Sequence, residues 1–303
     1  MVATNLAAGT TNLPAADDPV EKEYKKLMED DDAAQTEVEQ WIRDNDAAAA
    51  RGAALPAADL KRRIRDRLAP VRAAYDDFLK RHPNHTRARV AYGSFLNDLQ
   101  DEAGAQEQWE KALALNAQDP AAHNNLANLC GHTGQVRKAF EHYAKAIELN
   151  PKEPIYYHNF GTTVYLFRQD AMGFYGISEQ QVYDKALELY RKALELDPHN
   201  FPLAADVART YYGIKPLRLE DALRAWTNTL AIARDEIERE DVYLHFARLK
   251  LQADRFAEVR AHLNAVTNDT YAVLKQRLVR NLDEQEQNAK GTNAPPAVSG
   301  KQP

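Results

Sequence analysis

Apolar side chains recur every three to four residues along most of this chain, which is the spacing of one face of an α-helix. In residues 120–153, the clearest example, two such amphipathic segments meet at Gly134 and end at Pro151. The same arrangement recurs at 86–119, 154–200, 201–236 and 240–273. The pattern therefore predicts an all-α chain of about five helix–turn–helix units.

Small and large side chains stand at matching places in these units. The first helix of each carries Gly93, Ala127, Gly161, Ala208 or Ala247. The facing residue of the second helix is Ala105, Ala139, Ala186, Ala222 or Val259, and four positions further on stands Trp109, Tyr143, Tyr190, Trp226 or Leu263. Two antiparallel helices approach closely where both facing side chains are small, and the large residue fills the space beyond. Because no pair buries its apolar face alone, the units must stack.

Five such sets at a period near 34 residues resemble the tetratricopeptide repeat (TPR). The resemblance covers residues 86–273 and implies a right-handed α-solenoid. It also implies a non-catalytic interaction module or scaffold, which binds a protein or peptide partner in the concave groove of the superhelix without any cofactor. The closing proline of the repeat is present at Pro151 and Pro198 but absent from the first repeat and the last two.

The segments that flank the repeats have patterns of their own. Residues 1–17 are predicted to be a disordered leader and residues 18–85 a helical extension. A capping helix is predicted over 268–289, where it overlaps the last repeat, and a disordered tail over 290–303.

Within the N-terminal extension, the pattern predicts a helix over 19–45 and a loose linker over 46–58. Asp31 is the one polar residue on the apolar face of that helix, which leaves open a break near it. In the following segment the apolar spacing continues in phase through Pro70. That favours one helix kinked at the proline over two helices joined by a turn.

The resemblance also indicates which first-helix side chains would face the groove. The predicted partner-binding residues are Asn124, Asn128, His158, Thr162, Tyr165, Arg209, Tyr212 and Arg248. Asn124 and Asn128 lie one helical turn apart and can pair with both the donor and the acceptor of an extended peptide backbone. Ordinary solvated residues on an inner face are the alternative interpretation.

Some members of this family hold a C-terminal carboxylate with two lysines and two asparagines. Asn128 and Asn159 match the asparagines of that clamp, but Asn124 and Pro202 occupy the lysine positions. A clamp of this kind is therefore not expected.

The third repeat contains an insertion near 169–181. Ser178 and Gln181 have the spacing of a capping box, which predicts that the second helix restarts there and leaves 171–177 as an apolar loop. Met172, Phe174 and Tyr175 either pack on neighbouring helices or form a lip of the binding groove. In the alternative function, this loop or the N-terminal helices would assemble the chain into a homo-oligomeric structural protein.

The net charge of −6 is unevenly distributed. Residues 1–50 hold 12 acidic and 4 basic residues, whereas residues 51–90 hold 11 basic and 4 acidic ones, so we expect the two segments to pair. The arginine-rich face of the second segment consists of Arg62, Arg63, Arg65, Arg67 and Arg72. Contact with nucleic acid is the alternative for this face. No aromatic residues interleave with these arginines, which argues against it.

Candidate chemistry is sparse. No apolar run reaches the ~18–20 residues of a membrane helix. The start of the chain lacks the features of a signal peptide, so a cytoplasmic location is expected. Cys130 stands at a buried position of its repeat and is expected to act as a small hydrophobe rather than a nucleophile. His82 and His85 fall in a predicted turn, so we expect no metal site there. With no catalytic motif, the chain is not predicted to be an enzyme.

Overall fold

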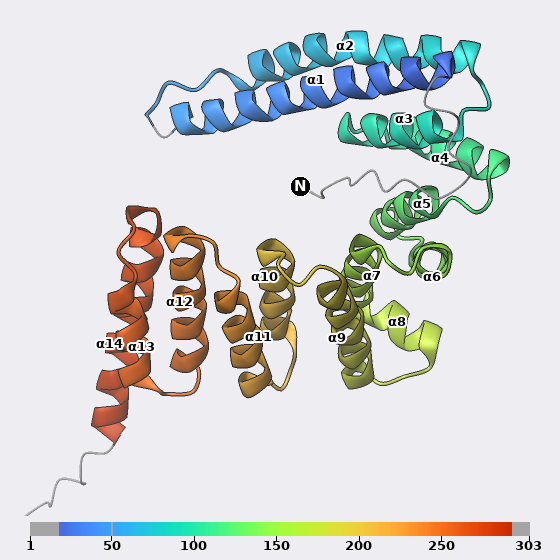
Figure 1. The fold of residues 1–303 in the computed structure, drawn as a ribbon. Coiled ribbons are helices and arrows are strands. Elements are labelled where there is room, and N and C mark those ends of the chain that lie inside the picture. Colours follow the sequence, from blue (N-terminus) through green and yellow to red (C-terminus); the bar gives the residue numbers. More distant parts are fainter. Residues whose placement is uncertain (1–17, 50, 293–303) are drawn as a thin grey trace, which may run out of the picture. The chain divides into compact units, whose positions relative to one another are not determined.

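A computed structural model of the chain describes residues 18–49 and 51–292, which divide into two units at Ile177/Ser178. These residues form α-helices and two short 3-10 turns, with no strand in the described ranges (Figure 1). The predicted leader lies outside the described residues, as does most of the predicted tail. Residues 290–292 belong to the last helix rather than to a tail.

The first unit consists of helices that follow one another with short connections (Figure 1). They are α1 (Pro19–Ala49), α2 (Ala57–Arg81), α3 (Thr86–Asp98), α4 (Glu102–Leu115), α5 (Pro120–His132), α6 (Val136–Leu149), α7 (Pro154–Leu166) and α8 (Arg168–Tyr175). Asp101 and Asp119 cap α4 and α5, since each carboxylate accepts a hydrogen bond from a backbone N–H of the first turn.

The second unit begins with the capping box that the sequence predicts, in which the Ser178 amide donates to the Gln181 side chain at 2.9 Å. Its helices are α9 (Glu179–Leu196), α10 (Phe201–Thr210), α11 (Leu219–Ala231), α12 (Glu236–Leu251), α13 (Phe256–Ala265) and α14 (Ala272–Thr292), with 3-10 turns at Tyr211–Gly213 and Asp269–Tyr271. Helix α12 begins four residues before the predicted repeat start at Glu240, because Asp235 caps it. The predicted third repeat therefore contributes α7 to the first unit and α9 to the second.

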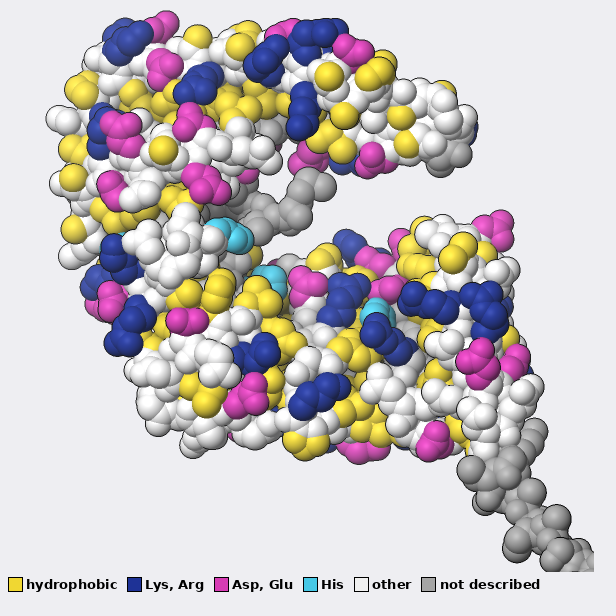
Figure 2. Space-filling view, turned by 180° about the vertical axis from the view of Figure 1, so that it is seen from behind, with side chains coloured by type: hydrophobic (Ala, Val, Ile, Leu, Met, Phe, Trp, Pro, Cys, Tyr) yellow, Lys and Arg dark blue, Asp and Glu magenta, His cyan; other side chains and the backbone are white. Residues whose placement is uncertain are grey.

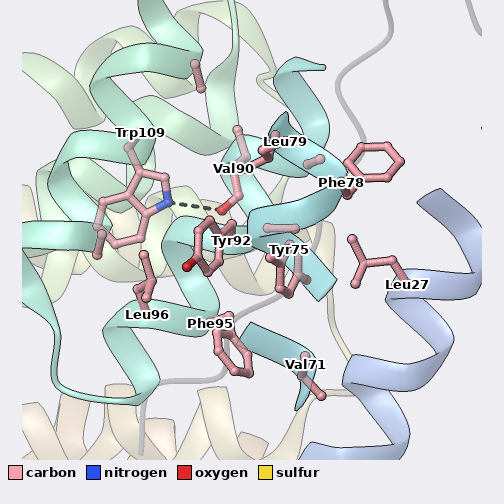
Figure 3. Packing of buried hydrophobic residues seen from close by; sticks show 14 of the residues in the cluster. Leu27, Val71, Tyr75, Phe78, Leu79, Val90, Tyr92, Phe95, Leu96 and Trp109 are labelled. Carbon is pink, nitrogen blue, oxygen red and sulfur yellow. Dashed lines mark hydrogen bonds between the residues drawn. The ribbon is translucent and has the colours of Figure 1, made fainter. Parts of the chain in front are cut away.

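The residues of the predicted small and large positions on the second helices are buried, as the register requires. Ala105, Ala139, Ala186, Ala222 and Val259 are each 0 % exposed. The large residues Trp109, Tyr143, Tyr190, Trp226 and Leu263 are also buried. In the first pair, the Trp109 indole donates to the Val90 carbonyl at 3.1 Å (Figure 3). A Cβ on Gly93 would overlap this indole ring, so the close approach of α3 and α4 requires a glycine there.

Helices α1 and α2 pack side by side, and α2 rests on α3 (Figure 1). Tyr75 of α2 stacks on Tyr92 of α3 with ring centroids 4.9 Å apart (Figure 3). No break occurs at Asp31, and α1 runs on to Ala49, four residues beyond the predicted end. Asp31 is tolerated on the apolar face because its carboxylate accepts a 2.6 Å hydrogen bond from the Tyr75 hydroxyl. Burial raises the pKa of Asp31.

The expected pairing of acidic and basic N-terminal segments occurs in part. Arg67 pairs with Glu37 at 2.7 Å, and the guanidinium of Arg63 lies 3.7 Å from the ring centroid of Trp41. Arg81 also pairs with Glu23 of α1. The other arginines of the predicted face bond elsewhere: Arg62 to Asp59, Arg65 to Asp66 and Arg72 to Asp101. Helix α2 continues unbroken through Pro70, as the phase of the pattern predicts.

Helix α14 covers the last helix pair. Leu278 and Leu282 are buried in one cluster with Leu244 and Leu263. The loop before α14 is held by Glu240, whose carboxylate accepts hydrogen bonds from the backbone amides of Thr267 and Asn268 at 2.9 and 2.8 Å. None of the described helices is both long and apolar enough to cross a membrane.

Candidate functional site

First-helix side chains of the first unit join into a polar ladder. The Asn125 amide of α5 donates to the Ser94 hydroxyl of α3 at 3.1 Å. Asn124 of α5 donates to Asn125 and accepts from Asn159 of α7, each at 3.2 Å. The ladder thus connects three successive first helices through side-chain amides, at the face that the sequence analysis assigns to partner binding.

Asn124 itself is not solvent-facing. It is only 6 % exposed, and both ends of its amide are bonded within the chain. Asn128, one turn along, is half-buried and accepts a 2.5 Å hydrogen bond from the Tyr143 hydroxyl. Tyr143 in turn accepts from Thr163 at 3.2 Å. The two asparagines predicted to meet a peptide backbone therefore differ, with Asn128 the more accessible one.

The α7 residues His158, Thr162 and Tyr165 follow the predicted spacing on one helix. All three are half-buried, so part of each side chain reaches the surface. Neighbouring positions of α7, such as Phe160 and Val164, are buried and point into the packing instead.

In the second unit, the predicted residues of α10 and α12 and the turn between α10 and α11 form a cluster of arginines and rings. The Arg248 guanidinium lies over the Tyr212 ring, 4.5 Å from its centroid. The Tyr212 hydroxyl lies 2.9 Å from Nδ1 of His245, whose ring stacks on Trp226 with a centroid separation of 3.9 Å. Arg209 pairs with Asp206 at 3.1 Å and with Asp241 at 3.2 Å.

The charge state of His245 follows from its surroundings. Its side chain is 16 % exposed. Burial, together with the smaller effects of the nearby Arg209 and Arg248 cations, lowers the pKa of His245 to about 3. The imidazole is therefore neutral near pH 7, and Nδ1 can accept a hydrogen bond from the Tyr212 hydroxyl. Asp241 has a raised pKa, chiefly because of burial and despite the opposing effect of Arg209.

Sequence reasoning missed several members of these clusters. His245 stands beside the inner-face position of Leu244, and only the fold brings it to Tyr212 and Trp226. Ser94 and Asp241 have the same spacing on their first helices as the predicted groove residues, and that spacing could have identified them. Asn125 lacks this spacing. Their hydrogen bonds cross between repeats, and no local pattern encodes which side chains meet.

The predicted apolar loop at 171–177 is wrong in its secondary structure. Residues 168–175 form helix α8, which ends at Gly176 with φ +65°. Phe174 and Tyr175 contact Phe140 of α6, with ring centroids 5.3 and 5.8 Å apart. Met172 is half-buried. Helix α8 brings both rings to Phe140. The spacing of the sequence did not predict this helix.

The side chains considered for catalysis or metal binding have structural contacts. His85 accepts the Ala88 amide at 3.0 Å and lies 3.3 Å from a Glu21 oxygen, while His82 lies 3.4 Å from Glu23. In the described ranges, no group of three or more His, Cys, Asp or Glu side chains is arranged to hold a metal ion. Cys130 is buried, and burial raises the pKa of its thiol, which disfavours the thiolate.

A cleft of about 450 Å³ lies between the second helices of the second unit. Its floor includes Leu187, Val207 and Tyr211, and its rim includes Arg191 and Arg224. The residues of the cluster around Tyr212 do not line this cleft. In the view of Figure 2, acidic and basic side chains are interspersed over the surface.

Comparison with known proteins supports one family. Models of the tetratricopeptide repeat match residues 120–153 and 179–200. The chain is similar to the photosystem I assembly protein Ycf3 of Synechococcus elongatus, with 26 % identity over 146 residues, covering 45 % of this chain and 83 % of that protein. It is also similar to regulator of microtubule dynamics protein 1 of Pongo abelii, with 30 % identity over 112 residues, covering 31 % of this chain and 36 % of that protein.

Solved structures show the same fold. Pseudomonas aeruginosa PilF matches with a TM-score of 0.51 and 17 % identity, covering 85 % of this chain and 99 % of that one. The pilus biogenesis factor PilW matches with a TM-score of 0.51 and 18 % identity, covering 66 % of this chain and 84 % of that one. The chain is an all-α protein of the α-solenoid class. Its segments 120–153 and 179–200 match the tetratricopeptide repeat, and these repeats support a protein–protein interaction scaffold.

Proposed function

We propose that this chain is a non-catalytic scaffold that binds an extended or helical segment of a partner protein along its first-helix faces. The residues proposed for contact in the first unit are Asn128, His158, Thr162 and Tyr165, with Asn124 contributing through the polar ladder. Those proposed in the second unit are Arg209, Tyr212 and Arg248. A cytoplasmic location stays a prediction from the sequence.

The observation that carries the proposal is the Arg248–Tyr212 stack. An exposed guanidinium held on a tyrosine, which is itself hydrogen-bonded to a buried histidine, is a preorganised polar contact. Arginine and tyrosine are the side chains enriched at sites that dominate protein–protein affinity. Because the Arg248 and Tyr212 side chains are already held in place, they lose little conformational entropy on binding, which favours affinity.

The alternative, a homo-oligomeric structural protein, has less support. The Phe174 and Tyr175 rings already pack on Phe140 within the chain. Glu23 and Glu37 of α1 already pair with Arg81 and Arg67 of the same chain. Both surfaces that would build the oligomer thus have internal partners. Met172, Phe174 and Tyr175 remain candidates for a lip of the binding surface only through their half-exposed parts.

Site-specific crosslinking tests the proposal. A photoreactive phenylalanine analogue is placed at Thr162 or Arg209 on the first helices and, as controls, at Glu110 or Arg224 on the second helices, and each protein is irradiated in native extract. We expect one partner to be captured from the first-helix positions only. Capture of that partner mainly from the control positions would refute binding along the first-helix faces.

A further inference from the structure

Arg248 differs from the other arginine of its cluster in having no carboxylate partner. Arg209 is neutralised by Asp206 and Asp241. Arg248 is exposed, and within the described ranges its guanidinium contacts the Tyr212 ring without making an ion pair with any Asp or Glu. Arg248 is therefore the arginine of this cluster that lacks a direct ion pair among the described residues.

Within the described ranges, the Arg248 guanidinium lies over the Tyr212 ring and its N–H groups make no hydrogen bond to an acceptor of the chain. A guanidinium is planar, and its N–H donors point outward from the edge in a fixed fork. With Cζ 4.5 Å from the Tyr212 centroid and no hydrogen bond from these donors to the described residues, the donors are left for another acceptor. Two parallel N–H groups of an arginine edge match the two oxygens of a carboxylate.

The support beneath the stack is rigid. Tyr212 bonds to His245, and the His245 ring lies against Trp226 at an interplanar angle of 12°. Trp226 is 0 % exposed. Tyr212 is therefore fixed at both its hydroxyl and its ring. Because His245 is neutral, it adds no charge that would compete with Arg248 for an anion.

We propose that the edge of Arg248, presented by Tyr212, is a receptor for one aspartate or glutamate side chain of the partner segment. This inference rests on the proposed function and adds the chemistry of the ligand: a segment that places an acidic side chain opposite α12. The one arginine of the cluster without an ion pair matches one carboxylate.

The same observations disfavour nucleic acid as the occupant. Binding to a phosphate backbone relies on several lysine or arginine contacts acting together. The described residues of the second unit carry 19 acidic and 17 basic side chains, and Asp206 and Asp241 lie beside the only other arginine of the cluster. A row of phosphates would meet these carboxylates.

The test uses the full chain and two labelled peptides of about twelve residues, both with acetylated and amidated ends. One is a Gly-Ser-Glu repeat, and the other has Gln in place of each Glu. Binding is measured by fluorescence anisotropy for the wild type, for Arg248→Gln, and for Arg277→Gln, which removes an exposed arginine of α14. Melting curves verify that both variants are folded. A labelled oligo-dT and a Glu peptide with a free C-terminus complete the set.

We expect the wild type to prefer the Glu peptide, Arg248→Gln to weaken that binding at least fivefold, and Arg277→Gln to leave it within twofold. The Glu peptide with a free C-terminus should bind less than twofold more tightly than the amidated Glu peptide. Equal binding by wild type and Arg248→Gln, no measurable binding of the Glu peptide, or an Arg248-dependent preference for oligo-dT or for the free C-terminus would each overturn the inference. If crosslinks still map to the first helices in that case, the proposed function stands and only the acidic ligand fails.

Discussion

Trp109 lies directly against the backbone of Gly93, so that a Cβ there would overlap its indole ring. Gly93→Ala should therefore force α3 and α4 apart and lower the free energy of unfolding by about 1–3 kcal/mol, as overpacked cores do. Gly131→Ala is the matched control, because its Cβ would meet Thr163 Cγ2 at an ordinary 3.7 Å. It should be neutral or stabilising, since alanine favours helix. Chemical denaturation measures both, and equal losses would contradict the packing.

The polar ladder predicts a cost for truncating Asn124. Its amide bonds to Asn125 and Asn159 at a site 6 % exposed, so Asn124→Ala should lower the free energy of unfolding by about 1–3 kcal/mol. The exposed Asn97 of α3 is the control, and Asn97→Ala should change stability by less than about 0.5 kcal/mol. A wild-type melting midpoint for Asn124→Ala would show that the ladder contributes nothing to stability.

The buried His245 predicts a dependence of stability on pH. Its pKa is about 3 in the folded chain, below the ordinary 6.5, so the unfolded chain binds the extra proton between these values. Stability from this residue is complete above about pH 6.5 and is lost as the pH falls toward 3. Asp241, with its raised pKa, acts in the opposite direction. Arg209 and Arg248 are the other charged groups that act on His245.

A comparison of variants isolates the histidine. His245→Gln should lose less stability than the wild type between about pH 7 and pH 4, whereas replacement of the exposed His199 by Gln should keep the wild-type slope. Thermal melts at several pH values give the slopes. The same slope for His245→Gln and wild type would mean that His245 is not held neutral in the fold.

Internal pairing of the N-terminal charges predicts the assembly state. Because Glu23 and Glu37 already pair with Arg81 and Arg67, the chain should sediment as a monomer at both about 50 mM and about 500 mM salt. Sedimentation velocity measures this. A dimer that dissociates at the higher salt would instead support assembly through α1 and α2.

The repeat register could be predicted because it depends on spacing and side-chain size, both of which are local. The five small second-helix residues were all identified from the sequence and are all fully buried. Gly134, with φ +78°, also lies at the turn between α5 and α6 where the pattern predicts it.

Features that depend on distant partners could not be predicted. Asp31 looked like a break because its partner, Tyr75, lies 44 residues away on α2. Phe174 and Tyr175 looked like a loop because Phe140, on which they pack, lies in the preceding repeat. For the candidate binding residues, the spacing predicts which side chains share a helix face. It does not predict which of them already bond to other residues of the chain. Asn124 is engaged and Arg248 has no carboxylate partner among the described residues.

The most direct test of the central claim is a titration of the partner identified by crosslinking against two charge-matched double variants. One is Arg209→Gln with Arg248→Gln on the first-helix faces. The other is Arg191→Gln with Arg224→Gln, at the rim of the cleft between the second helices. The account predicts at least a tenfold loss of affinity for the first variant and less than a twofold change for the second. Unchanged affinity for the first, or a larger loss for the second, would contradict binding along the first-helix faces.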